Sequence, residues 1–132
     1  MNSLEQYTAL SAVWIGLAWV PYIIDRAMVR GLMGALANYD PDATPQSPWA
    51  QRAMRAHQVA LEAFVAFAPL AVIAMLKIPE DPYPGLLAKG FFFAILAHYF
   101  IYALGITVLR TLAFTLAALS TLALGLRLLG VI

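Results

Sequence analysis

Four long apolar runs constrain the possible folds of this chain more than any other feature of its sequence. They cover residues 6–24, 56–76, 90–109 and 111–126. The first run has no charged residue, and its 19 residues, at about 1.5 Å of helical rise each, nearly cross the ~30 Å hydrocarbon core of a bilayer. Of the 132 residues, 63% are hydrophobic, whereas a soluble domain is about 45–50% apolar. The sequence therefore predicts an all-α, integral membrane four-helix bundle.

Glycine, proline and charged residues divide these runs into the helices of a single membrane domain, 1–132. We expect transmembrane helices over approximately 4–30, 48–76, 86–108 and 110–131. The connection at 31–50 is interpreted as a loop with a possible amphipathic start. KIPEDPYPG at 77–85 has three prolines and predicts a tight non-helical turn. Only Arg110 separates the last two runs, which predicts a helical hairpin at that residue.

The second helix carries its own start and kink signals. Ser47 is a candidate N-cap, and Pro48 follows at the first helical position, where a missing N–H costs nothing. Pro69 lies inside the helix, where it removes a backbone hydrogen bond and crowds the preceding turn. We therefore expect a kink near Pro69.

Polar residues interrupt the start of this second helix, in the stretch QRAMRAHQVALE at residues 51–62. A charged side chain inside a membrane helix costs about 2.5–3.5 kcal/mol on insertion scales, so it is seldom left without a partner. Three of the charged residues lie on one helix face, because positions three and four residues apart lie on the same side of a helix. The positions that form this stripe are Arg52, Arg55, Val59, Glu62 and Ala66. We expect this stripe to face other helices with something polar between them.

Each polar residue also has a structural interpretation. Arg52 and Arg110 are placed where arginines commonly extend to lipid headgroups. Glu62 could contact a ligand or pair with an arginine. His57 lies about 200° around the helix from Arg55, which favours a hydrogen bond to a different neighbouring helix. His98 and Tyr102 are four residues apart, share a face, and could also bond between helices.

Composition excludes several classes of function. The chain has no cysteine, which removes disulfides, a cysteine nucleophile and thiolate metal sites. Its two histidines have no acidic pair at ligand spacing, so no metal site is predicted. A net charge of +1 gives no reason to expect a nucleic-acid partner.

Basic residues predict the orientation in the membrane, because they are enriched in cytoplasmic connections. The first and third connections carry five, namely Arg26, Arg30, Arg52, Arg55 and Arg110. The remaining segments carry three, namely Lys77, Lys89 and Arg127. We therefore expect the 31–50 loop in the cytoplasm and both termini on the opposite side. All five cytoplasmic-side residues are arginines, whose planar forks suit carboxylates.

Three segments resemble the MAPEG family, the membrane-associated proteins in eicosanoid and glutathione metabolism. They are RGLMGALANYDP at 30–41, QRAMRAHQVALEAF at 51–64 and AHYFIYALGITVLRTLAF at 97–114. The middle segment is similar to the family signature on the second helix, Arg, any two, Arg-Ala-His or Arg-Ala-Gln, any, Asn, any two, Glu. The resemblance covers nearly the whole chain and is nearest to the small bacterial members. It implies an integral protein of the bacterial inner membrane.

The resemblance also implies an assembly, a cofactor and a site. Family members are homotrimers that bind glutathione between neighbouring subunits near the cytoplasmic side, among membrane lipids. The implied glutathione-binding residues are Arg30, Arg55, His57, Glu62, His98 and Tyr102. Arg110 matches the catalytic arginine beside the glutathione sulfur, and a nearby cation raises the thiolate fraction. The implied activity is a glutathione-dependent transferase or peroxidase acting on lipophilic electrophiles.

The sequence departs from the family pattern at a few positions. Val59 replaces the asparagine between Arg55 and Glu62, which removes one amide contact. Ala63 follows the glutamate where relatives often have asparagine or tyrosine. The family proline is displaced to Pro69.

Two other functions fit the same sequence. A small four-helix transporter could use the intramembrane Glu62 to carry a cation or a proton-coupled substrate. A non-catalytic membrane protein could keep the family scaffold, and the changes at Val59 and Ala63 are compatible with it. Binding of glutathione by the purified protein would separate the enzyme from both alternatives.

Overall fold

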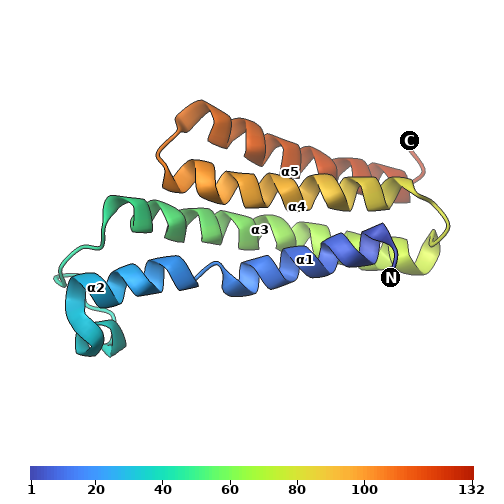
Figure 1. The fold of residues 1–132 in the computed structure, drawn as a ribbon. Helices are drawn as coiled ribbons and strands as arrows, with labels where there is room; N and C mark the ends of the chain where they lie inside the picture. The colour runs from blue at the N-terminus through green and yellow to red at the C-terminus, as the bar shows by residue number, and fades with distance from the viewer.

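Five helices fold into a bundle with four membrane-length spans. The computed structural model describes residues 1–132 and has no strand (Figure 1). The helices are α1 (Ser3–Leu17), α2 (Val20–Leu36), α3 (Pro48–Lys77), α4 (Tyr83–Ala103) and α5 (Thr107–Leu128). Together α1 and α2 make one 34-residue span, so four segments are long and apolar enough to cross a membrane. The predicted all-α, four-span membrane fold is confirmed.

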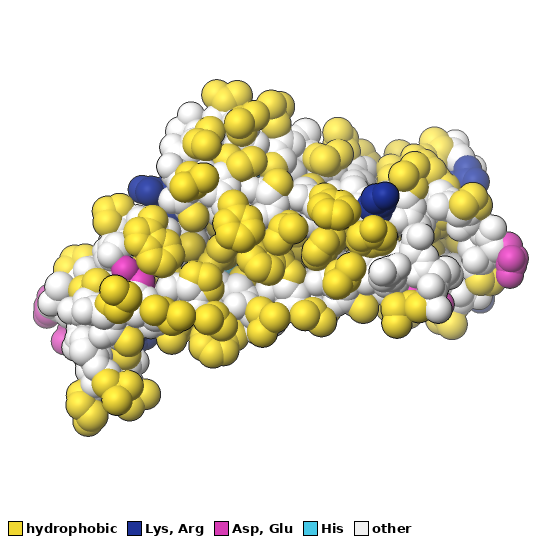
Figure 2. Space-filling view, viewed as in Figure 1, with side chains coloured by type: hydrophobic (Ala, Val, Ile, Leu, Met, Phe, Trp, Pro, Cys, Tyr) yellow, Lys and Arg dark blue, Asp and Glu magenta, His cyan; other side chains and the backbone are white.

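The outer surface of the bundle is suited to lipid. Hydrophobic side chains cover most of the face in Figure 2, and charged side chains gather mainly toward the two ends. Large apolar residues on α3, such as Val65, Val72 and Ile73, are exposed. A soluble domain rarely exposes so continuous an apolar surface. The surface therefore supports an integral membrane protein.

The first span is broken between α1 and α2, where one unbroken helix over about 4–30 was expected. Pro21 has no N–H, so the helical hydrogen bond to the carbonyl of Leu17 cannot form. Three carbonyls around the break are bound by side chains instead. Ile15 O accepts from His57 Nε2 at 2.7 Å, Gly16 O from Trp19 Nε1 at 2.8 Å, and Ala18 O from the Tyr99 hydroxyl at 2.8 Å.

The 31–50 segment is not a loop throughout, because α2 continues to Leu36. Gly31 has a φ of 73°, a left-handed conformation that bends the helix and that glycine adopts without steric cost. The remaining connection folds back along α2. Arg30 Nε donates to Thr44 O at 2.7 Å, and Arg26 Nη2 donates to Ala37 O at 3.0 Å.

The start of α3 lies where the sequence placed it, with Ser47 at the N-cap and Pro48 at the first position. The Ser47 side chain makes no capping bond, however. Instead, the buried Asp25 accepts the Ser47 backbone N–H at 3.0 Å. A carboxylate at a helix N-terminus also interacts favourably with the helix dipole. Further along, α3 stays helical through Pro69, and the expected kink there stays a prediction.

Small residues let the helices of the core approach closely. The helix α4 packs against α1, α3 and α5. Alanines of α3 and α4 are fully buried between the helices, and Phe67 stacks on Phe91 with ring centroids 4.2 Å apart. Small side chains at helix contacts are the usual packing mode in membranes.

The sequence predicted the hairpin between the last two helices at Arg110, but the turn lies earlier in the chain. The turn is Leu104–Ile106, so α4 ends at Ala103 and α5 begins at Thr107. Gly105 has a φ of 81°, and Ile106 N donates to Ile101 O, which is the bonding of a glycine-terminated helix end. Arg110 consequently lies within the first turn of α5 and projects from a helix.

Candidate functional site

Three residues expected in the site line one cavity near the α4–α5 turn. His98 and Tyr102 come from α4, and Arg110 comes from α5. The cavity has a volume of about 240 Å³, and its other walls are Val59, Thr111 and Phe114. The structure therefore brings residues of α3, α4 and α5 together at the end of the bundle that holds the α4–α5 turn.

An aromatic ring positions the cation of this cavity. The guanidinium carbon of Arg110 lies 4.5 Å from the centroid of the Tyr102 ring, within the range of a cation–π contact. The only ion pair in the subunit involves other residues, and Arg110 makes no hydrogen bond to protein atoms. Its N–H groups therefore remain available to a ligand.

The histidine of the cavity is nearly buried. His98 is 5% exposed, and its ring meets the Tyr102 ring edge-on at a centroid distance of 5.5 Å. No hydrogen bond joins its ring nitrogens to another residue of the subunit, although it lines the cavity. A buried imidazole of this kind can donate to or accept from a polar ligand group.

A second cavity of about 300 Å³ adjoins the first. The two share Val59 and Phe114, and the second adds Glu62. Its remaining walls are short or weakly polar, namely Ala63, Ala66, Ala118 and Thr121. Val59 thus lies at the junction of the two cavities.

Glu62 has no partner within the subunit. It is exposed on α3, and neither a hydrogen bond nor an ion pair reaches its carboxylate. A carboxylate at membrane depth is costly unless it is neutral, paired or in contact with something polar. Within this chain the Glu62 carboxylate therefore remains unpaired.

Arg55 does not line either cavity. Its side chain is exposed and its Nη1 donates to Oε1 of Gln58 on the same helix at 3.0 Å. Arg55 lies seven residues before Glu62, on the same helix face. It therefore extends the polar stripe of α3 toward the start of the helix, facing away from the subunit core.

Arg30 lies in a separate place, on α2. It lines a third cavity, of about 250 Å³, with the folded-back loop that includes Tyr39, Asp40 and Gln46. Its Nε is held by Thr44. Within the chain, Arg30 therefore does not line the cavity of His98, Tyr102 and Arg110.

His57 bonds to neighbouring helices on a different side of α3 from Arg55, as the helix geometry predicted. Its Nε2 bonds to a carbonyl oxygen, which only accepts, so that nitrogen carries a proton. In the neutral ring, Nδ1 then accepts from the Tyr22 hydroxyl at 2.7 Å. Both ring nitrogens are thus engaged across the α1–α2 break.

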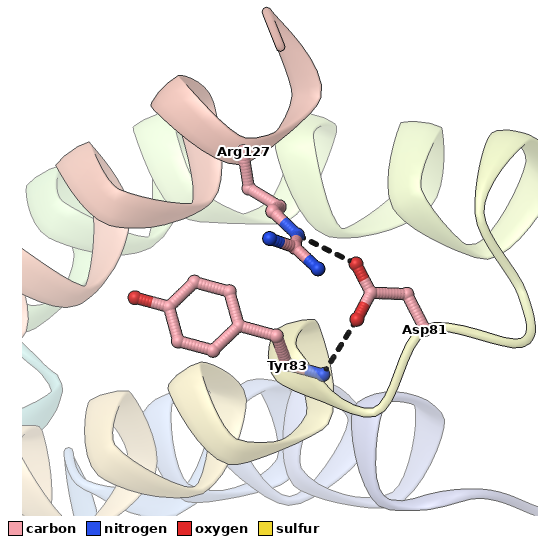
Figure 3. A network of polar contacts seen from close by, with 3 residues as sticks. All are labelled: Asp81, Tyr83 and Arg127. Carbon is pink, nitrogen blue, oxygen red and sulfur yellow. Dashed lines mark hydrogen bonds and ion pairs between the residues drawn. The ribbon is translucent and has the colours of Figure 1, made fainter. Parts of the chain in front are cut away.

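Two charged contacts were missed by sequence reasoning. Arg52 Nε donates to the carbonyl of Ala103 at 3.0 Å and packs against Gly105, so it ties α3 to the end of α4. At the opposite end, Arg127 Nε lies 2.7 Å from Asp81 Oδ2 (Figure 3). The expected topology placed Asp81 and Arg127 at the same end of the bundle, which was the available signal for this pair.

The sequence was compared with models of protein families and with curated proteins. The model of the MAPEG family matches residues 4–130, which is almost the whole sequence. No curated protein matches the chain.

Proposed function

The chain belongs to the MAPEG family, and from this premise we propose that it is a glutathione-dependent transferase or peroxidase acting on lipophilic electrophiles. The observation that carries the proposal is the cavity lined by His98, Tyr102 and Arg110, next to a second cavity that contains Glu62. A cation with free donors and an unpaired carboxylate complement the charges of glutathione. Glutathione has two carboxylates, an amine and a thiol.

Arg110 is the residue we propose to act on the sulfur. A cation beside a thiol lowers the thiol pKa and increases the thiolate fraction. Tyr102 holds the guanidinium in place without consuming any of its N–H donors. In a transfer reaction the thiolate would form a carbon–sulfur bond with the electrophile while the leaving group departs with its electron pair.

Arginines on α2 and α3 are proposed to bind the carboxylates. Arg55 has donors left after its bond to Gln58, and Arg30 has both terminal nitrogens left after its bond to Thr44. Paired N–H donors of a guanidinium match a carboxylate. Glu62 is proposed to accept from the amine or an amide of glutathione.

The two histidines fit different roles. His98 faces the cavity with no bonded nitrogen and is proposed as a direct contact. His57 already bonds Ile15 and Tyr22, so its proposed contribution to the cofactor site is to hold the α1–α2 break that sets the position of Arg30. Any direct contact from His57 would have to replace one of these bonds.

A homotrimer would complete the site. In one subunit, Arg30 lines a different cavity from Arg110, and Glu62 has no partner. A neighbouring subunit could supply the missing arginine and cover the carboxylate, with lipids around the assembly. Native mass spectrometry in mild detergent should report three subunits, and a monomer would remove this part of the proposal.

The orientation is proposed from the arginines. Both termini and the α3–α4 turn lie at one end of the bundle, and the α2–α3 and α4–α5 connections lie at the other (Figure 1). The arginine-rich end belongs in the cytoplasm by the distribution of basic residues, in a bacterial inner membrane. Cysteines introduced at Thr44 and Glu80 should label from opposite sides.

A transporter is the second candidate, and the unpaired Glu62 favours it. A carboxylate in a membrane helix that lines a cavity could bind a cation or proton during transport. Transport of a cation or proton would not require glutathione. A scaffold protein without catalytic activity would likewise have no need to bind glutathione.

Isothermal titration of the purified protein with glutathione tests the proposal, with S-methylglutathione as the matched ligand that lacks an ionisable thiol. We expect both to bind, and glutathione to release a proton at neutral pH because its thiol ionises beside Arg110. Absence of heat for both ligands would leave the transporter or the scaffold.

A further inference from the structure

Another cavity lies at the end of the bundle opposite Arg110. Its volume is about 550 Å³, within the ~300–1,000 Å³ typical of small-molecule sites. Its walls come from the α3–α4 turn, the start of α4, the end of α5 and the C-terminus. They are Asp81, Pro82, Tyr83, Leu86, Arg127 and Ile132. The proposed glutathione site uses none of these residues.

Two contacts hold Arg127 at the edge of this cavity. Its Nε bonds to Asp81 Oδ2 at 2.7 Å, and its guanidinium carbon lies 5.3 Å from the centroid of Tyr83 (Figure 3). Asp81 is itself fixed, because its other oxygen accepts the backbone N–H of Tyr83 at 3.0 Å. The guanidinium has five N–H groups, and the bond to Asp81 uses the one on Nε. The four on the terminal nitrogens remain for a ligand.

The position of the cavity in the chain matches the headgroup layer of a membrane. Tyr83 opens α4, and Arg127 is the last residue but one of α5, so both stand at the ends of membrane-length helices. Tyrosine and arginine are common at this depth. Leu86 lies one turn further into α4 and is 64% exposed, which provides an apolar wall on the membrane side. Ile132, 51% exposed, provides another.

We propose that this cavity binds one anionic phospholipid, with its phosphate on the terminal nitrogens of Arg127 and an acyl chain along Leu86 and Ile132. The fork of an arginine matches two phosphate oxygens, and the apolar walls match the chain. The occupant is a lipid because the cation stands at the end of the spans and the apolar wall leads toward the hydrocarbon.

Asp81 limits the strength of this binding. It fixes Arg127, but its negative charge opposes a phosphate and offsets the charge of the guanidinium. Removing that charge with Asp81→Asn should therefore tighten lipid binding, since asparagine keeps an oxygen that can accept from Arg127. If the Asp81–Arg127 pair were purely structural, Asp81→Asn would not bind lipid more tightly than the native protein.

The experiment uses the full-length protein in detergent and measures thermal stability and native mass spectra with short-chain phosphatidylglycerol. Diacylglycerol with the same chains lacks the phosphate, and inorganic phosphate lacks the chains. We expect phosphatidylglycerol alone to raise the melting temperature and to appear as one bound molecule per subunit. Arg127→Gln should weaken its affinity roughly tenfold or more, as for loss of a charged hydrogen bond. Lys89→Gln, which removes an exposed cation outside the cavity, should not.

Four results would overturn the proposal. Equal stabilisation by inorganic phosphate would indicate a simple anion site, and equal stabilisation by diacylglycerol would indicate an apolar groove. Loss of subunit assembly in Arg127→Gln, with no lipid bound to the native protein, would mean that a second copy fills the cavity. If Arg127→Gln does not fold, the Asp81→Asn variant tests the proposal instead. An affinity of Asp81→Asn for phosphatidylglycerol no higher than that of the native protein would contradict it.

Discussion

The two ends of the bundle differ in whether their charged side chains have partners. At the end with both termini, Arg127 and Asp81 form an ion pair that Tyr83 supports. At the arginine-rich end, Arg55 bonds only to Gln58 of its own helix, and Glu62, halfway along α3, has no partner. The Nε of Arg26 is buried there without a hydrogen-bond partner. Unpaired charge at membrane depth is costly, so the arginine-rich end is the one that a ligand or a neighbouring subunit should complete.

The largest effect should come from Arg55→Ala, which should weaken glutathione binding by about 2–5 kcal/mol, as for truncating one partner of a buried charged contact. Arg55 has no strong bond within the subunit, so its removal should cost little stability. Calorimetry checks the affinity, with Lys89→Ala as a control that removes a cation from the other end. Equal affinities for Arg55→Ala and the control would break the distinction between the two ends.

Arg110→Ala should change the state of the bound thiol more than the affinity. Without the cation beside it, the thiolate fraction at neutral pH should fall about tenfold, equivalent to ~1.4 kcal/mol. Ultraviolet absorbance of the thiolate at saturating glutathione measures this fraction.

Two changes at Tyr102 sharpen the same prediction. Phenylalanine keeps the aromatic face under the guanidinium of Arg110, whereas leucine removes it. The thiolate signal should survive Tyr102→Phe and decrease in Tyr102→Leu. A signal that is unchanged in Tyr102→Leu and Arg110→Ala would mean that Arg110 does not act on the sulfur.

Val59→Asn should tighten glutathione binding by about 1 kcal/mol, the usual net contribution of one hydrogen bond. Val59 lies where the two cavities meet, so an amide there could reach a ligand that occupies both. Val59→Leu is the matched variant, because it adds bulk without an amide. Equal affinities of the two variants would remove Val59 from the site.

The smallest effect belongs to the paired end. The hydrogen bond from Arg127, with that from the Tyr83 backbone and the charge of Arg127, lowers the pKa of Asp81 below its ordinary value of 3.8. A lowered pKa in the folded state means that the pair stabilises the fold above pH 3.8 and that this stabilisation disappears as the pH falls through the folded-state pKa. In acid-induced unfolding, the free energy of unfolding should fall slightly more for the native protein than for Asp81→Asn, which lacks the titrating carboxyl group. An equal decrease in both proteins would contradict this prediction.

The spans and the grouping of some site residues followed from sequence patterns. Four apolar runs gave four membrane-length segments, because run length is set by bilayer thickness. The i, i+4 spacing of His98 and Tyr102 put both on one face of α4, and both line the same cavity. Such features depend on local periodicity, which a single sequence displays.

Other features depended on contacts between distant segments. The side chains that bind the carbonyls at the α1–α2 break come from α3 and α4 as well as from the break itself, and no local pattern reveals them. The hairpin was placed at Arg110 because the charge interrupts the apolar run, yet the left-handed Gly105 ends the helix earlier. A charge near a helix end marks a boundary less reliably than a glycine that can adopt positive φ.

The most direct test of the account is the thermal stability of the detergent-purified protein with and without millimolar glutathione, run beside Arg110→Ala, Arg55→Ala and Asp81→Asn. A ligand that binds only the folded state raises the melting temperature. We predict a rise for the native protein and for Asp81→Asn, a smaller rise for Arg110→Ala, and little or none for Arg55→Ala. No rise in the native protein, or an equal rise in all four, would contradict the claim that glutathione completes the arginine-rich end.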